Sequence, residues 1–177
     1  MSRCGPYSPS QIPSDIEKAT RSKNNLNKNR LQWVDKSNHD TIGIVVGSSS
    51  GRFACGTSTN GANHKVAGRL GDSPIVGAGC YGSDDVGGAA ATGDGDIMLR
   101  FLPSYSAWNY MRLGFSPQKA CELALAAIPP YYPTFQGGIV CLNATGGHGA
   151  ASYNMEFSYS LASDDTHGEV VTMPVSV

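Results

Sequence analysis

Hydrophobic residues are sparse over the first 38 positions and gather in short runs from residue 41 onward. Residues 5–38 are rich in Pro, Ser, Asn and Lys without a sustained period, which predicts a loop or linker. Residues 41–46 (TIGIVV) are β-branched and apolar, a turn-forming GSSSG follows, and residues 52–57 (RFACGT) predict the returning strand of a hairpin. Because the first run is continuously apolar rather than alternating, we expect that strand to be buried on both faces.

The next segment is dominated by glycine. Ten glycines fall within residues 61–95, which predicts a winding stretch where backbone lies close to backbone or to a ligand. The residues DGD at 94–96 can cap a helix over 97–102, and Pro103 then breaks or kinks it. Helical texture resumes at 108–113 and ends at the following glycine.

A second helix, a buried strand and a strand-rich tail complete the pattern. Ser116 and Pro117 form an N-cap with proline at the first helical position, and apolar residues recur on one face as far as residue 128. Residues 138–142 (GIVCL) predict a buried strand, and the tail from residue 150 predicts two or three short strands. This order of elements predicts a layered α+β domain.

Composition limits the possible classes of protein. With 177 residues the chain has the size of one domain, and with 40% hydrophobic and 15% charged residues it is not disordered as a whole. No apolar run approaches the roughly 18 residues of a membrane span. Residues 1–40 carry seven basic and four acidic residues, but with only two aromatic residues, Tyr7 and Trp33, and no stacking platform they do not favour nucleic-acid binding. We therefore expect neither a membrane nor a nucleic-acid partner.

Several short motifs lack the context that their chemistry needs. The GAGCYG at 77–82 matches a dinucleotide fingerprint, but no apolar helix follows it. The DGD at 94–96 lacks the later ligands of a calcium loop, and the GxSxG of serine hydrolases does not occur. The four histidines are scattered and no CxxC pair exists, so we expect no metal and no cofactor. Five cysteines leave at least one without a partner within the chain.

A candidate nucleophile stands where the polar leader meets the first strand. Thr41 opens that strand directly after His39 and Asp40. A threonine hydroxyl is a weak nucleophile unless a base is beside it, and the threonine's own α-amino group, with a pKa of about 7.7–8.0, can act as that base. This solution requires cleavage of the Asp40–Thr41 bond. Threonines often open strands, so the junction alone is weak evidence.

The motifs downstream carry a family resemblance. They are GTSTNG at 56–61, GRLGDSP at 68–74, ATGDGD at 91–96 and RFLPSY at 100–105. With the HDTIG junction they resemble the glycosylasparaginases (aspartylglucosaminidases) of the N-terminal-nucleophile hydrolase superfamily. The resemblance implies an αββα sandwich, of which this chain would hold mainly the β portion over 41–177. Residues 1–40 would then be the remnant of the α portion before the autocleavage site.

The resemblance also implies a role for each matched residue. His39 and Asp40 would shape the self-cleaved junction, and Thr41 would attack the side-chain amide of a glycosylated asparagine. The substrate contacts and catalytic helpers would be Arg69 for the α-carboxylate, Asp72 for the α-ammonium, Thr92 and Gly93 as the oxyanion hole, Gly95 as a backbone contact, and Thr59 beside the nucleophile. Arg69 and Asp72 together would select a free amino acid over an asparagine within a protein.

Further features are implied for assembly and cellular location. Cys121 and Cys141 match a disulfide pair, and Asn143 of the NAT sequon matches a glycosylated position, so the resemblance implies a lysosomal or secreted protein, although the chain shows no signal peptide. Cys55 and Cys80 have no family counterpart and are interpreted as buried thiols. The family implies an α-type partner segment and an (αβ)2 assembly. Two alternatives stay open: a truncated, inactive homologue with a binding or secreted role, and an isoaspartyl peptidase or L-asparaginase of the same superfamily.

Overall fold

The structure is a computed structural model that describes residues 40–62 and 65–175. The chain divides into two compact units, one formed by residues 41–59 with 70–177 and a smaller one formed by 1–40 with 60–69. Each unit is described by itself. Every helix and strand of the described residues belongs to the larger unit.

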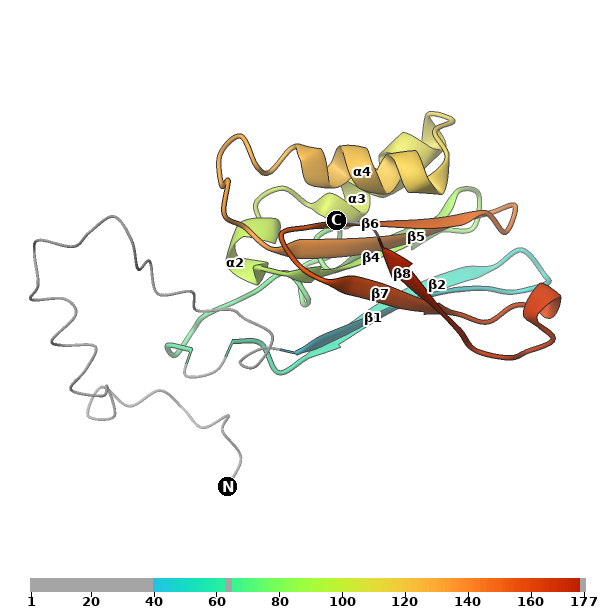
Figure 1. Cartoon of the computed structure of the whole chain (residues 1–177), viewed down its shortest axis with the longest axis horizontal. Helices are drawn as coiled ribbons and strands as arrows, with labels where there is room; N and C mark the ends of the chain where they lie inside the picture. Colours follow the sequence, from blue (N-terminus) through green and yellow to red (C-terminus); the bar gives the residue numbers. More distant parts are fainter. Residues whose placement is uncertain (1–39, 63–64, 176–177) are drawn as a thin grey trace, which may run out of the picture. The chain divides into compact units, whose positions relative to one another are not determined.

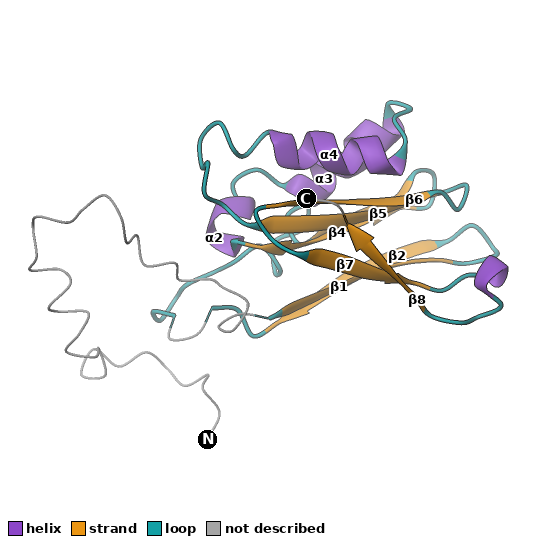
Figure 2. Cartoon of the chain, in the orientation of Figure 1, coloured by secondary structure: helices purple, strands orange, loops and turns teal. Residues whose placement is uncertain are grey.

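The larger unit is built in layers of helix, sheet and sheet (Figures 1 and 2). Its middle layer is an antiparallel sheet with the strand order β3-β4-β5-β6. The strands are β3 (Cys80–Ser83), β4 (Gly87–Gly93), β5 (Gly137–Asn143) and β6 (His148–Tyr153). Two helices, α3 (Pro103–Arg112) and α4 (Pro117–Ala126), cover one face of this sheet. This mixed α+β architecture with antiparallel sheets agrees with the predicted fold class.

The other face of the sheet meets two antiparallel strand pairs. The predicted hairpin is present as β1 (Thr41–Gly47) and β2 (Phe53–Thr59), with Thr41 directly opposite Thr59. The second pair consists of β7 (Phe157–Leu161) and β8 (Val171–Val175), with the short 3-10 helix η2 (Asp164–Thr166) between them. Strand β7 crosses β5 closely, because a Cβ added at Gly138 would lie 2.8 Å from the ring of Phe157.

Strand β4 has almost no side-chain bulk, which lets the layers approach one another. Its sequence is GGAAATG, and its first five residues are buried. A Cβ added at Gly43 of β1 would lie 2.9 Å from Cβ of Ala90, and one added at Gly88 would lie 2.9 Å from Cγ1 of Val45. The winding segment predicted for 61–95 is therefore wrong in part, since it contains β3 and β4. Its close backbone approaches are real.

The second helix follows its sequence signals. The Ser116 hydroxyl accepts a hydrogen bond from the backbone N–H of Lys119 at 3.3 Å, and Pro117 occupies the first turn. The helix ends at Ala126, two residues before the predicted limit. Its buried face joins the hydrophobic core between the helices and the sheet. The largest fully buried side chains there are Phe135, Met98, Ile128 and Ile139.

The first helical segment differs from the prediction. Helix α2 (Gly95–Met98) has four residues, and the side chain of Asp94 makes no capping hydrogen bond to it. Asp94 Oδ2 instead accepts the backbone N–H of Gln136 at 3.1 Å. Pro103 does not break a helix but starts α3, because Leu102, with φ of 49°, redirects the chain before it.

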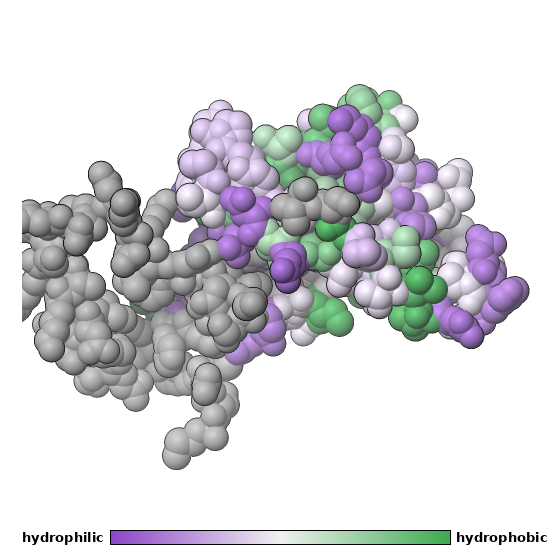
Figure 3. Space-filling view, in the orientation of Figure 1, coloured by the Kyte–Doolittle hydropathy of each residue, from purple (hydrophilic) through white to green (hydrophobic). Residues whose placement is uncertain are grey.

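The expectation that the first strand is buried on both faces is wrong. Ile42, Ile44 and Val46 are 69%, 57% and 49% exposed. These three alternate residues share the outer face of β1, while Gly43 and Val45 face β4. Within the described residues nothing covers that outer face enough to bury them. Figure 3 shows hydrophobic atoms reaching the surface elsewhere too, at the turn between α3 and α4, where Leu113 and Phe115 are exposed.

An aromatic cluster fixes α3 on the edge strand β3. The Trp108 indole N–H donates a hydrogen bond to the Ser83 hydroxyl at 2.9 Å, and its ring stacks on Tyr105 with 5.7 Å between centroids. Tyr81 packs edge-on against both rings.

Among the helices of 40–62 and 65–175, none combines the length and hydrophobicity needed to cross a bilayer.

Candidate active site

The hydroxyl of Thr41 is hydrogen-bonded to that of Thr59. Their Oγ1 atoms are 2.9 Å apart, and either hydroxyl can be the donor. The hairpin register produces this contact because it sets the two threonines opposite one another at the open end of β1 and β2. Thr41 is half-buried, whereas Thr59 is exposed. The nucleophilic role of Thr41 and the assisting role of Thr59 stay predictions.

Thr41 also lines a cavity of about 390 Å³ between the two sheet layers. Strands β1 and β7 form one wall, and β4 and β5 form the other. Thr92 lines the same cavity, so the structure brings the candidate nucleophile and one candidate oxyanion donor to a common space. His148 and Tyr159 also line it, and the Tyr159 hydroxyl is 2.8 Å from Nδ1 of His148.

Gly93 ends β4 in a backbone conformation that a side chain would strain. Its φ is +139°, and a Cβ there would lie 2.3 Å from the carbonyl oxygen of Gln136. Thr92 and Gly93 are paired with the glycines of β5 at positions 138 and 137. The conformation of this strand end therefore depends on glycine, as a backbone donor site would require. The oxyanion-hole role stays a prediction.

Asp72 and Gly95 lie against each other. Asp72 is 4% exposed, and a Cβ added at Gly95 would lie 2.9 Å from its Oδ1 atom. The next residue, Ser73, accepts a hydrogen bond through its carbonyl oxygen from Thr57 Oγ1 at 2.9 Å. Since Thr57 is two residues from Thr59 on β2, this bond fastens the Asp72 loop to the strand that carries Thr59. Sequence reasoning missed Thr57, although it lies inside the quoted GTSTNG motif.

Arg69 and Asp40 belong to the smaller unit. A Cβ on Gly61 would lie 3.0 Å from Nη1 of Arg69, and the backbone N–H of Asn60 donates to Asp40 Oδ1 at 3.2 Å. The placement of Arg69 against a substrate stays a prediction. His39 lies outside the described residues.

The cysteines predicted to form a disulfide are both buried in the core. Cys121 and Cys141 are present as thiols, and the Cys121 thiol donates to the carbonyl oxygen of Gly149 at 3.6 Å. Burial raises the pKa of Cys121 well above its ordinary value, and the hydrogen bond with the Cys141 thiol adds to this shift. The two thiols are therefore neighbours, and their disulfide stays a prediction.

The sequon asparagine is held by a turn. Asn143 Oδ1 accepts three hydrogen bonds, from the backbone N–H of Thr145 at 3.1 Å, the Thr145 hydroxyl at 2.9 Å and the backbone N–H of Gly147 at 2.7 Å. Glycosylation at Asn143 stays a prediction.

In residues 40–62 and 65–175, no three His, Cys, Asp or Glu side chains gather as a metal site would need.

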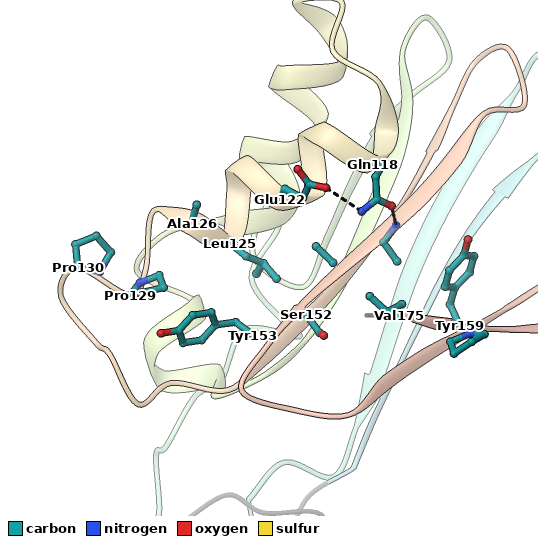
Figure 4. A pocket seen from close by; sticks show the side chains of 13 residues that line it. Gln118, Glu122, Leu125, Ala126, Pro129, Pro130, Ser152, Tyr153, Tyr159 and Val175 are labelled. Carbon is teal, nitrogen blue, oxygen red and sulfur yellow. Dashed lines mark hydrogen bonds between the residues drawn. The ribbon is translucent and has the colours of Figure 1, made fainter. Parts of the chain in front are cut away.

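A larger cavity, of about 850 Å³, lies apart from the predicted site residues (Figure 4). Helix α4 and strand β6 form two of its walls, and residues of β7 and β8 close it. At one end Gln118 donates to Glu122 and accepts the backbone N–H of Ala150 at 3.2 Å. The hydrogen bonds that Glu122 accepts from Gln118 and from Lys119 hold its pKa below its usual value. None of the predicted catalytic or substrate-binding residues lines this cavity.

Comparisons with known proteins match nearly the whole chain. A family model described as "Asparaginase" matches residues 9–172. The N(4)-(beta-N-acetylglucosaminyl)-L-asparaginase of Rattus norvegicus is 51% identical over 148 residues, which cover 84% of this chain and 40% of the rat protein. The Mus musculus protein of the same name is 45% identical over 170 residues, covering 94% of this chain and 46% of its own length.

A relative with another described activity matches almost equally well. The probable isoaspartyl peptidase/L-asparaginase 3 of Arabidopsis thaliana is 42% identical over 165 residues, covering 92% of this chain and 46% of its own length. The chain thus spans less than half the length of each of these three relatives.

Proposed function

The chain belongs to the asparaginase family, and on that premise we propose that it carries the nucleophile of an amidohydrolase that cleaves the N4-(β-N-acetylglucosaminyl)-L-asparagine linkage. The observation that carries the proposal is the hydrogen bond of 2.9 Å between Thr41 and Thr59, beside a cavity that Thr41 and Thr92 both line. A threonine nucleophile needs its hydroxyl oriented and in reach of a substrate, and the hydrogen bond and the shared cavity support these two conditions for Thr41.

Self-cleavage comes first. Thr41 Oγ attacks the carbonyl carbon of Asp40, so that the amide becomes an ester and the nitrogen of Thr41 becomes a free amine. Water then hydrolyses the ester, leaving a carboxylate on Asp40 and the restored hydroxyl on Thr41. The new α-amine has a pKa of about 7.7–8.0 and can accept the hydroxyl proton at neutral pH. One residue then serves as nucleophile and base.

The cleaved site then acts on the substrate side chain. Thr41 Oγ attacks the amide carbon, forms a β-aspartyl ester, and the sugar leaves as a glycosylamine after taking up the proton held by the α-amine. Water hydrolyses the ester and frees aspartate. Thr92 and Gly93 stabilise the oxyanion, a contribution of about 2.7–4 kcal/mol for each donor. Their position at the end of β4 supports this role, since Thr92 lines the Thr41 cavity.

N-terminal sequencing of the purified chain tests the proposal. We expect a new terminus that begins Thr-Ile-Gly, and release of aspartate from glycosylated asparagine once the chain is assembled with its α-type segment. Failure of cleavage after prolonged incubation would contradict the hypothesis of a self-processed enzyme. It would favour the alternative hypothesis of a truncated, inactive homologue. Cleavage without aspartate release would mean that the junction is competent for self-cleavage but that the substrate site is incomplete.

Thr59→Ala is expected to slow self-cleavage by roughly 10- to 100-fold, because a hydrogen bond to a reacting group contributes about 1–3 kcal/mol. Thr59 is exposed, so the variant should fold normally. The measurement is the time course of cleavage on denaturing gels. Thr59→Ser keeps the hydroxyl and is the matched control. Equal rates for the alanine variant and the wild type would remove Thr59 from the mechanism.

Arg69→Ala is expected to lower kcat/KM for glycosylated asparagine by roughly 10- to 100-fold, mainly through KM, because a guanidinium–carboxylate contact contributes about 1.5–3 kcal/mol. The active, cleaved protein is assayed with this substrate and with an analogue that lacks the α-carboxylate. For the analogue, kcat/KM should be the same in the variant as in the wild type. An unchanged KM for the true substrate would refute the assigned contact.

The exposed face of β1 supports an assembly with further polypeptide. Ile42, Ile44 and Val46 are exposed side by side on one face of β1, and contiguous exposed apolar side chains mark interaction surfaces. We infer that an α-type segment covers this face, within an (αβ)2 assembly, and that the protein works in a lysosomal or secreted setting. The hydrolysis of glycosylated asparagine is then a property of that assembly.

The Arabidopsis relative supports a second candidate function, hydrolysis of isoaspartyl dipeptides or asparagine. Both substrates present the same α-carboxylate and α-ammonium as glycosylated asparagine, and both react through a β-carbonyl carbon. Comparing kcat/KM for the three substrates decides between the functions. A preference for the isoaspartyl dipeptide would replace the first proposal while leaving Thr41 as nucleophile.

A further inference from the structure

Two cysteines outside the predicted site lie on neighbouring strands of different sheets. Cys55 lies on β2, where it pairs in register with Val45 of β1. Cys80 opens β3, where it pairs with Ala90 of β4. Both side chains are partly buried, and both are present as thiols. The 24 residues between them include Arg69 and Asp72.

The two thiols face each other across the layer boundary. A Cβ added at Gly82 of β3 would lie 3.6 Å from Cys55 Sγ. Cys80 and Gly82 are two residues apart on one strand, so their side-chain directions share a face, and that face is the one that meets Cys55. The pKa of Cys55 agrees with this placement. Burial raises it to about 12, with a hydrogen bond and charge interaction from the Cys80 thiol adding to the shift.

We propose that Cys55 and Cys80 form a disulfide that joins the β1–β2 hairpin to the four-stranded sheet. The oxidant is a low-molecular-weight disulfide such as oxidised glutathione. The Cys80 thiolate attacks one glutathione sulfur and releases the first glutathione thiolate. Cys55 then loses its proton as its sulfur attacks the Cys80 sulfur of the mixed disulfide, releasing the second. Two protein thiols and one glutathione disulfide thus become one protein disulfide and two reduced glutathiones.

The position of this link gives it a consequence for the nucleophile. Cys55, Thr57 and Thr59 are alternate residues on one face of β2. Thr57 is already bonded to Ser73, and Thr59 to Thr41. A covalent bond at Cys55 would complete a row of three attachments along that face. It would hold the strand that supports Thr41 against the sheet. It would also reduce the conformational entropy of the unfolded chain, because it closes the loop that contains Arg69 and Asp72.

Peptide mapping tests the link directly and does not depend on the proposed activity. The full chain is equilibrated with oxidised glutathione, alkylated and digested with trypsin. Cleavage places Cys55 in peptide 53–65, Cys80 in peptide 70–100, Cys4 in peptide 4–18, and both Cys121 and Cys141 in peptide 120–177. We expect peptides 53–65 and 70–100 joined to each other, and separated by a reductant. In the variant Cys55→Ser, peptide 70–100 should carry either glutathione or the alkylating group and should not be joined to another peptide.

Thermal unfolding gives the second readout. Oxidation should raise the Tm of the wild-type chain by roughly 5–10 °C relative to the reduced chain. The double variant with Cys55→Ser and Cys80→Ser shows the redox-dependent shift that the other cysteines contribute, and this shift should be smaller than that of the wild-type chain by the contribution of the Cys55–Cys80 link. Recovery of peptides 53–65 and 70–100 as separate species, alkylated or carrying glutathione, from folded, oxidised protein would overturn the proposal. So would a link from either one to peptide 4–18 or 120–177.

Discussion

We expect Thr41→Ala to leave the chain whole on a denaturing gel, whereas the wild-type chain should separate into pieces of 40 and 137 residues. Alanine has no hydroxyl to attack the Asp40 carbonyl, so the ester cannot form. Without the ester there is no free α-amine, and the second reaction loses its nucleophile and base together. We expect cleavage and amide hydrolysis each to fall by at least about 10³-fold.

Thr41→Ser is the matched control for this change. Serine keeps an attacking oxygen and lacks one methyl group, so it should still cleave, more slowly. Because Thr41 is half-buried at the start of an edge strand, neither substitution should unfold the protein. Cleavage of the alanine variant at the same bond would mean that another group, or a contaminating protease, cuts the junction. The proposed mechanism would then be wrong.

Gly149→Ala is expected to cost about 3 kcal/mol of unfolding free energy or more, with a fall in Tm of roughly 6–12 °C. A Cβ at Gly149 would lie 2.4 Å from the backbone nitrogen of Gln118 and 2.9 Å from the carbonyl carbon of Pro117. The first turn of α4 therefore rests directly on β6. Backbone atoms cannot turn aside as a flexible side chain can, so the helix must shift away from the sheet.

That shift would also break the contacts that hold the helix start. Gln118 would lose the Ala150 N–H, and the Cys121 thiol would lose the Gly149 carbonyl. Chemical denaturation of both proteins measures the cost. Gly56→Ala is the control, because the nearest atom to a Cβ there is 3.9 Å away. An equal, small effect at both positions would show that the helix is not seated on Gly149.

Local signals in the sequence were enough for some elements but not for others. Ser116 and Pro117 act within four residues of themselves, so the start of α4 is as predicted. Asp94 carries an equally good cap signal, yet its carboxylate bonds to Gln136, 42 residues away. Strand β4 was missed because glycine and alanine have low strand propensity, and only the closeness of two layers selects them.

The candidate site shows the same limit. The hairpin pattern places Thr41 opposite Thr59, so their contact follows from a local register. The shared cavity with Thr92 depends on how β1 lies over β4, which no local pattern encodes. The sequence pattern also fails to predict the exposure of Ile42 and Ile44, because a run of apolar residues does not show whether another element packs over it.

The indole of Trp108 gives the helical layer an optical reporter of its own. Its ring is bonded to Ser83 and stacked on Tyr105, so its emission wavelength depends on whether α3 stays seated against β3. The only other tryptophan is Trp33, and Trp33→Phe would leave a single emitting ring. Intrinsic fluorescence could then follow the docking of this helix in real time, separately from any change at the threonine end of the hairpin.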